Sequence, residues 1–97
     1  MANKRIIPVD QFCMVYNVEV SFIHTLSDYG LTEITLVEQV PHIYENKIRD
    51  IEKMIRLYYD LEINIEGIQA ISHLLEQVDA LQNETRMLKN RLKFFEP

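Results

Sequence analysis

The chain has 97 residues, of which 26% are charged and 47% are hydrophobic, and its formal net charge is -5. This length allows one small domain with an extension, and the balance of charged and apolar residues excludes a disordered chain. No apolar run reaches the roughly 18 residues that a membrane span requires. The N-terminal residues show no signal-peptide pattern, and the single cysteine, Cys13, excludes an internal disulfide. We therefore expect a cytoplasmic protein.

The charges are distributed unevenly along the chain. No lysine or arginine occurs from Ile6 to Asn46, whereas the following acidic residues all fall in that segment: Asp10, Glu19, Asp28, Glu33, Glu38 and Glu45. Such a segment should repel a phosphate backbone and attract a basic protein surface. The sequence thus favours a protein partner over nucleic acid.

The first two elements are expected to be short helices. One should begin at Pro8, whose missing N–H costs nothing in a first helical turn, and end at Asn17. The other should run from about Val20 to Tyr29 and end at Gly30. Their buried faces would be formed by Val9, Phe12, Cys13, Tyr16, Phe22, Ile23 and Leu26. Two short helices joined by a tight turn are typical of a helix-turn-helix.

A short hairpin, or wing, is expected between Leu31 and Tyr44, because β-branched residues are frequent there and Pro41 would confine itself to an edge or turn. A third helix should span about Asn46 to Leu61, and Asn64 is a suitable N-cap for a fourth. The buried stripe of the third helix would comprise Ile48, Ile51, Ile55 and Tyr58, with Tyr59 at its rim.

The last helix carries a heptad stripe with spacings of three and four residues, the pattern of a coiled-coil seam. The stripe consists of Ile71, Leu74, Val78, Leu81, Thr85, Leu88, Leu92 and Phe95. About 30 helical residues extend roughly 45 Å, too far to be covered by the preceding chain. We therefore expect a domain over residues 1–65 and a dimerisation helix over 66–97, packed as one unit.

The orientation of this dimer can be inferred from charge. Glu76 and Asp79 lie early in the helix, whereas Arg86, Lys89 and Arg91 lie late. An antiparallel pair would place acidic side chains beside basic ones, and a parallel pair would bring like charges together. The sequence favours an antiparallel homodimer.

The sequence shows no residues arranged for catalysis or for metal binding. Cys13, His24, His42 and His73 lie on separate elements without the close spacing of a zinc site. There is no glycine-rich phosphate loop and no activated-nucleophile turn. We expect no metal, no cofactor and no enzymatic activity.

The layout of the elements resembles the MerR-type winged-helix family. Val9-Asp10-Gln11-Phe12-Cys13 opens the first helix as in that family, Gly30-Leu31 closes the second, and Leu61-Glu62-Ile63-Asn64-Ile65-Glu66 resembles the link before the last helix. The resemblance implies a mainly α-helical fold: a winged helix-turn-helix followed by a long coiled-coil helix.

The positions that contact DNA in the MerR-type family differ in this chain. Met14 and Val15 replace a basic pair, His24-Thr25-Leu26 replaces Arg-Tyr-Tyr, and Val40-Pro41-His42 replaces Gly-Tyr-Arg of the wing. DNA binding depends on cations that displace counterions from phosphates. The loss of these cations argues against DNA binding. A DNA-binding transcriptional regulator of the MerR type is the alternative interpretation.

The chain resembles one branch of the family, the CbpM chaperone modulators of bacteria. This branch fits both the positions that match the family and the positions that differ from it. The similar segments are Leu81 to Leu92 and Ile55-Arg56-Leu57 with Leu61. The resemblance implies binding and inhibition of the J-domain of a DnaJ/CbpA-type co-chaperone, which presents a basic helix to its chaperone. Candidate contacts are Asp28, Glu33, Glu38 and Glu45, with Tyr59 and Asp60 as alternates.

Overall fold

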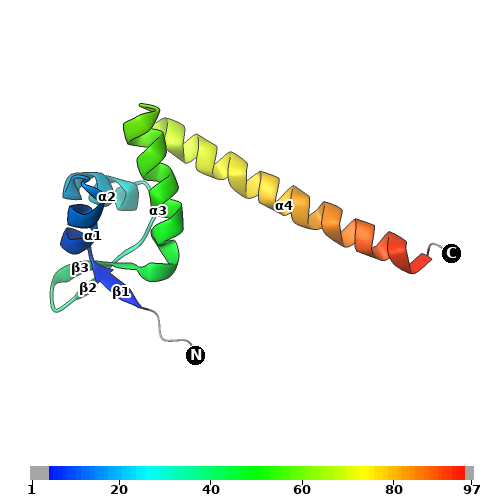
Figure 1. Ribbon diagram of the computed structural model, residues 1–97, viewed down its shortest axis with the longest axis horizontal. Helices are drawn as coiled ribbons and strands as arrows, with labels where there is room; N and C mark the ends of the chain where they lie inside the picture. Colours follow the sequence, from blue (N-terminus) through cyan, green and yellow to red (C-terminus); the bar gives the residue numbers. More distant parts are fainter. Residues whose placement is uncertain (1–4, 96–97) are drawn as a thin grey trace.

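The computed structural model describes residues 5–95 of the chain (Figure 1). In order, the elements are β1 (Ile6–Pro8), α1 (Val9–Tyr16), α2 (Val20–Asp28), β2 (Ile34–Val37), β3 (Val40–Tyr44), the 3-10 turn η1 (Glu45–Lys47), α3 (Ile48–Ile55), the π-helical turn η2 (Arg56–Asp60) and α4 (Ile65–Phe95). The fold is mainly helical, and the expected order of two short helices, a hairpin, a third helix and a long helix is confirmed. Strand β1 was not expected from the sequence.

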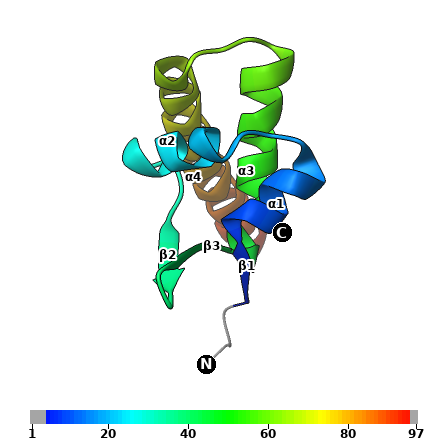
Figure 2. The ribbon, with the colours of Figure 1, turned by 90° about the vertical axis from the view of Figure 1, so that its left-hand side faces the viewer.

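The molecule consists of a globular head and a projecting helix. Figures 1 and 2 show α1, α2 and the sheet packed on one side of α3, with α4 starting beside the end of α3 and running away from the head. The described chain measures 59 × 37 × 21 Å along its principal axes. Most of α4 therefore has no neighbour in this single chain.

Within residues 5–95, the sheet has three antiparallel strands in the order β1-β3-β2. Glu38 and Gln39 connect β2 to β3 with positive φ values of 51° and 67°, which is the backbone of a tight two-residue hairpin turn. This confirms the expected wing.

Pro41 lies in the middle strand, and our expectation of an edge or turn position needs correction. It pairs with Leu36 of β2, but β1 reaches only His42 to Tyr44. In an antiparallel ladder, alternate residues direct their N–H groups to opposite sides, and Pro41 follows the pair that closes the hairpin. Its nitrogen therefore points to the side that β1 leaves uncovered, where no ladder hydrogen bond is lost.

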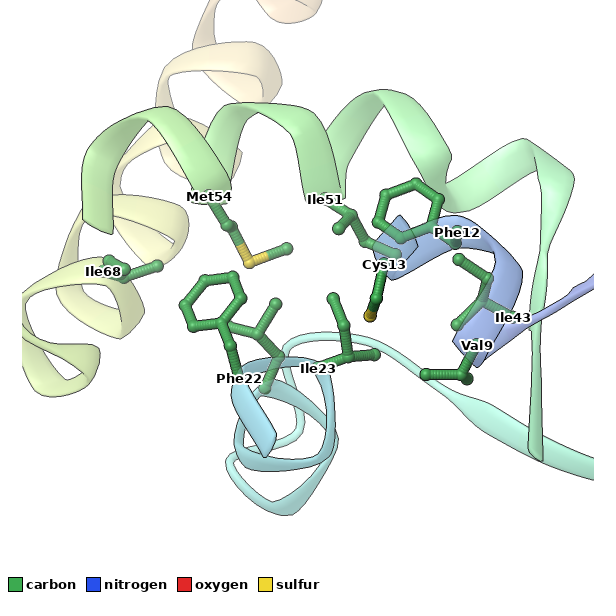
Figure 3. Packing of buried hydrophobic residues seen from close by; sticks show 10 residues of the cluster. Val9, Phe12, Cys13, Phe22, Ile23, Ile43, Ile51, Met54 and Ile68 are labelled. Atoms are coloured by element: carbon green, nitrogen blue, oxygen red, sulfur yellow. The ribbon is translucent and has the colours of Figure 1, made fainter. Parts of the chain in front are cut away.

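The hydrophobic core joins every helix of the head with the first turns of α4 (Figure 3). It comprises Val9, Phe12, Cys13, Phe22, Ile23, Leu26, Ile43, Ile51, Met54 and Ile68. The expected buried faces of the first two helices are thus confirmed, except that Tyr16 is half-buried. Because Ile68 is fully buried, the start of α4 belongs to the core of the head.

Three helix ends follow from local backbone chemistry. Asn17 adopts the left-handed conformation (φ 55°, ψ 49°) and ends α1, as expected. Gly30 has a φ of 74°, and Leu31 N–H donates to the Leu26 carbonyl at 2.8 Å, which closes α2. Asn64 Oδ1 accepts the Gly67 N–H at 2.8 Å and caps α4. Pro8, in contrast, is the N-cap of α1 and the last residue of β1, one position before the expected first turn.

The third helix changes its geometry midway. After Ile55 the chain continues as the π turn η2, in which Leu61 N–H donates to the Arg56 carbonyl at 3.2 Å. A π turn holds more residues than an α turn and so shifts the side chains that follow around the axis. Tyr58 is consequently 38% exposed, and the expectation that it belongs to the core is wrong.

Candidate functional site

The face formed by α1, α2 and the hairpin has apolar and acidic side chains where a DNA-binding winged helix needs cations. This face is turned toward the viewer in Figure 2. Met14 and Val15 at the end of α1 are 80% and 74% exposed, and Leu36 near the hairpin turn is 67% exposed. The sequence has no lysine or arginine from Ile6 to Asn46, and these elements all lie in that segment. A phosphate backbone finds no positive partner from these elements.

The acidic candidate residues are exposed, and they lie on separate elements. Asp28 ends α2, Glu33 precedes β2, Glu38 occupies the hairpin turn and Glu45 begins η1. Glu45 lies 4.0 Å from the Arg5 guanidinium, in an exposed pair that contributes little to stability. The structure does not gather the four carboxylates into one cluster. They spread a negative potential over the head.

Tyr59 and Asp60, the alternate candidates, lie in η2. The Tyr59 ring packs edge-on against Phe22 at 5.3 Å between centroids, and its hydroxyl accepts the Glu19 N–H at 3.4 Å. Glu19, Phe22, Tyr58 and Tyr59 contribute to a shallow hollow of about 140 Å³. Asp60 is exposed beside it. These two residues therefore form a second, separate surface.

The heptad stripe of α4 is uncovered in this chain. Ile71 is half-buried at the edge of the head, and every described residue from His73 to Phe95 is exposed. Leu81 is 61% exposed, Leu88 is 52% exposed and Phe95 is 83% exposed. An isolated helix with such a stripe would leave a large apolar surface in water. The stripe is thus an exposed apolar surface along the free part of α4.

A groove between α3 and α4 was not foreseen from the sequence. It has a volume of about 410 Å³ and is lined by Tyr29, Gly30, Leu31, Asp50, Lys53, Met54, Leu57, Gln69, Ser72, His73, Leu75, Glu76 and Asp79. This volume is within the range of ligand pockets, about 300–1,000 Å³. Carboxylates stand on both walls, with apolar side chains between them.

The groove was missed because each wall, taken alone, looks like an ordinary mixed helix face. Asp50, Lys53, Met54 and Leu57 follow the i, i+3, i+4, i+7 spacing on one helix. A similar spacing occurs on α4, but nothing in the sequence indicates that the two faces oppose each other. The sequence offers one hint of the groove: each of these two helix faces combines leucine or methionine with acidic residues.

Two hydrogen bonds fix the start of α4 against the end of α2, at the base of the groove. Tyr29 donates its hydroxyl proton to the Glu66 carboxylate at 3.0 Å, and the Gln69 side-chain amide donates to the Tyr29 carbonyl at 3.2 Å. The hydrogen bond to Glu66, followed by the negative charge of that residue, raises the pKa of the Tyr29 hydroxyl. Both bonds therefore join α4 to Tyr29, the residue that follows α2 and lines the groove.

Cys13 has no feature of a reactive thiol. Burial, and then the nearby charge of Asp10, raises the pKa of its thiol above the ordinary value. The side chain lies in the core among Val9, Ile23 and Ile43 (Figure 3). It acts as a small apolar core residue.

Two further findings apply to residues 5–95. In this part of the chain, no three His, Cys, Asp or Glu side chains come together in an arrangement that could hold a metal ion. Within the same range, the helices also lack an apolar segment long enough to cross a membrane.

The fold and its surfaces define a small winged helix-turn-helix protein whose expected DNA-contacting face lacks cations. A sequence model of the family described as "MerR HTH family regulatory protein" matches residues 7–90, and the chain belongs to this family. Among curated relatives, "Chaperone modulatory protein CbpM" of Pseudomonas entomophila (strain L48) is 24% identical over 98 residues, covering 98% of this chain and 97% of the relative. By these similarities the chain is a CbpM-like MerR-family protein. No solved structure matches it.

Proposed function

We propose that this protein is a chaperone modulator that binds the J-domain of a DnaJ/CbpA-type co-chaperone and inhibits it. One observation carries the proposal: the helix-turn-helix and wing have kept their fold while presenting exposed Met14, Val15 and Leu36, with no lysine or arginine from Ile6 to Asn46. Near-full-length similarity to a chaperone modulatory protein supports the same function. The family description names a regulatory protein and the name of the relative a modulatory one, and neither names an enzymatic activity.

The mechanism would be occlusion without chemistry. A basic J-domain surface is attracted by the negative head, and the bound protein covers the surface that the DnaK-type chaperone would otherwise contact. Asp28, Glu33, Glu38 and Glu45 supply this attraction at long range, since spread surface charges act mainly on association rates. Tyr59 and Asp60 are proposed as additional contacts beside α2.

The proposed functional unit is an antiparallel homodimer held by α4. The stripe from Ile71 to Phe95 would be covered by the same stripe of a second copy, and its exposure in the single chain supports this pairing. The acidic half of each α4, which carries Glu76 and Asp79 on the side away from the stripe, would then lie level with the basic end of the other. The residues 66–97 would form the assembly segment and 1–65 the head.

Isothermal titration calorimetry with the full-length CbpA-type co-chaperone of the same organism tests the proposal. We expect a complex with a dissociation constant in the micromolar range or tighter, which weakens as salt is raised from 50 to 300 mM because the attraction is electrostatic. No detectable heat at 50 mM salt and at protein concentrations of about 100 μM would contradict it.

DNA binding by a MerR-type regulator is the second candidate function, and the family description favours it. A gel-shift assay with genomic DNA fragments separates the two functions. We expect no retardation at micromolar protein in 100 mM salt. A specific complex whose affinity falls steeply with salt would support the regulator and oppose the modulator.

A further inference from the structure

We propose that the groove between α3 and α4 is the docking site for a basic amphipathic helix of the partner protein. This inference rests on the proposed function and deepens it, because it assigns the contact with the J-domain to a definite site. The groove lies outside the residues chosen from the sequence, since Asp28, Glu33, Glu38, Glu45, Tyr59 and Asp60 do not line it.

The lining residues describe the chemistry of the occupant. Met54, Leu57 and Leu75 supply apolar contacts, of which Leu75 is 49% exposed. Asp50 stands on the α3 wall, and Glu76 and Asp79 stand on the α4 wall. These three carboxylates outnumber the positive charge that Lys53 contributes. An apolar floor between acidic walls fits a helix with one apolar side and flanking cations.

The walls have the length and direction that such a helix requires. The lining positions extend from Asp50 to Leu57 on the α3 side and from Gln69 to Asp79 on α4. At 1.5 Å per residue these walls are about 10 Å and 15 Å long, or two to three helical turns. Figure 1 shows that α3 and α4 meet at one end and diverge toward the free part of α4.

A dimer formed through the α4 stripe would leave this groove open. Successive helical residues are about 100° apart around the axis. Ser72, Glu76 and Asp79 therefore share the side of α4 that faces α3, whereas Leu74 and Leu81 lie roughly opposite. A second copy paired along the stripe would sit on the far side of α4. The groove and the stripe are consequently separate surfaces, each free to bind its own partner.

Charge reversal on the α4 wall tests the assignment. Glu76→Lys/Asp79→Lys changes two exposed side chains of the groove. Asp10→Lys/Glu62→Lys is the matched control, because it makes the same change in net charge at two exposed acidic residues outside the groove and outside the proposed contacts. Calorimetry with the full-length CbpA-type co-chaperone should give at least tenfold weaker binding for the groove variant and a change within threefold for the control. Far-ultraviolet circular dichroism should be unchanged for both.

The outcomes separate this inference from the proposed function. Tight binding by the wild type together with unimpaired binding by the groove variant would overturn the groove assignment and leave the modulator function intact. Equal weakening by both variants would also overturn it, because the effect would then come from net charge alone. Absence of binding by the wild type would overturn both proposals.

A second readout does not depend on any variant. In ¹H–¹⁵N spectra of the wild-type chain titrated with the same co-chaperone, the largest changes should fall on the amides of Lys53, Leu57 and Ser72. Changes concentrated between Glu33 and Val40 would place the contact on the hairpin and overturn the inference. Changes concentrated between Leu81 and Leu92 would indicate that the partner binds the α4 stripe, with the same consequence.

Discussion

Individual residues decide how the elements of the head are joined, and Tyr16 is the clearest example. Its hydroxyl donates to the Glu52 carboxylate at 2.6 Å, a part-buried bond between α1 and α3. This hydrogen bond is the main cause that raises the pKa of Tyr16, with burial and the charge of Glu52 adding to it. The protonated phenol is thus favoured in the folded protein.

Tyr16→Phe should lower the free energy of unfolding by about 1 kcal/mol at pH 7, because a part-buried hydrogen bond is lost. Since the folded pKa is raised, the stabilisation is complete below the unfolded pKa of about 10 and is lost as the pH rises through the folded pKa. Urea unfolding at pH 7 to 11 measures both effects. The difference between wild type and variant should shrink above pH 10, and a difference that is absent at pH 7 would contradict the assigned bond.

Gly67 is required by close packing at the start of α4. A Cβ built on Gly67 would lie 2.7 Å from the Ile63 Cγ2 methyl and 3.1 Å from Asn64 Oδ1. Gly67→Ala should therefore destabilise the protein by about 1–3 kcal/mol, although alanine is the better helix former by about 1 kcal/mol. Thermal unfolding followed by circular dichroism measures the change.

A double-mutant cycle provides the control for Gly67. In an Ile63→Ala background the clashing methyl is absent, and Gly67→Ala should then cost less or be favourable. An equal cost in both backgrounds would mean that the contact with Ile63 is not the reason for the glycine.

At the scale of elements, part of the fold could be predicted from residues that act on the local backbone. Asn17, Gly30 and Asn64 were expected to end or cap helices, and all three do, because their roles depend on their own backbone and nearest neighbours. The apolar faces of α1 and α2 were found by periodicity for the same reason. These features needed no knowledge of distant contacts.

Other elements depend on tertiary contacts that the sequence does not display. Strand β1 is only three residues long, and it exists because Ile6 to Pro8 pair with His42 to Tyr44. The π turn η2 shifts Tyr58 and Tyr59 toward Phe22, which a uniform helical period could not indicate. The groove was missed for the same reason, because its two walls come from α3 and α4 and face each other only in the folded protein.

The free part of α4 gives a test at this scale. Leu81→Asp and Leu88→Asp each place a charge in the proposed seam, where it would lack water and a partner. We expect sedimentation equilibrium to give half of the wild-type mass for either variant. Asn90→Asp adds the same charge on the side of α4 opposite the stripe, and it should keep the wild-type mass. An unchanged mass for the two leucine variants would mean that the stripe does not hold the dimer.

At the scale of the whole molecule, the chain separates a negative head from a positively charged helix end. The segment from Ile6 to Asn46 lacks cations, whereas Arg86, Lys89, Arg91 and Lys93 lie in the last turns of α4. This polarity can serve antiparallel pairing of two copies and attraction of a basic partner at the same time. The family fold was recognisable from the sequence, but the proposed change of partner from DNA to protein rests on the missing cations. Fold alone does not determine function.

Stimulation of a DnaK-type ATPase by the CbpA-type co-chaperone tests the central claim most directly. Steady-state ATP hydrolysis would be measured with fixed chaperone and co-chaperone while this protein is added to saturation. We predict that the stimulated rate falls to the basal rate of the chaperone, and that excess chaperone restores it because both compete for one J-domain surface. A stimulated rate that stays unchanged at saturating protein would contradict the account.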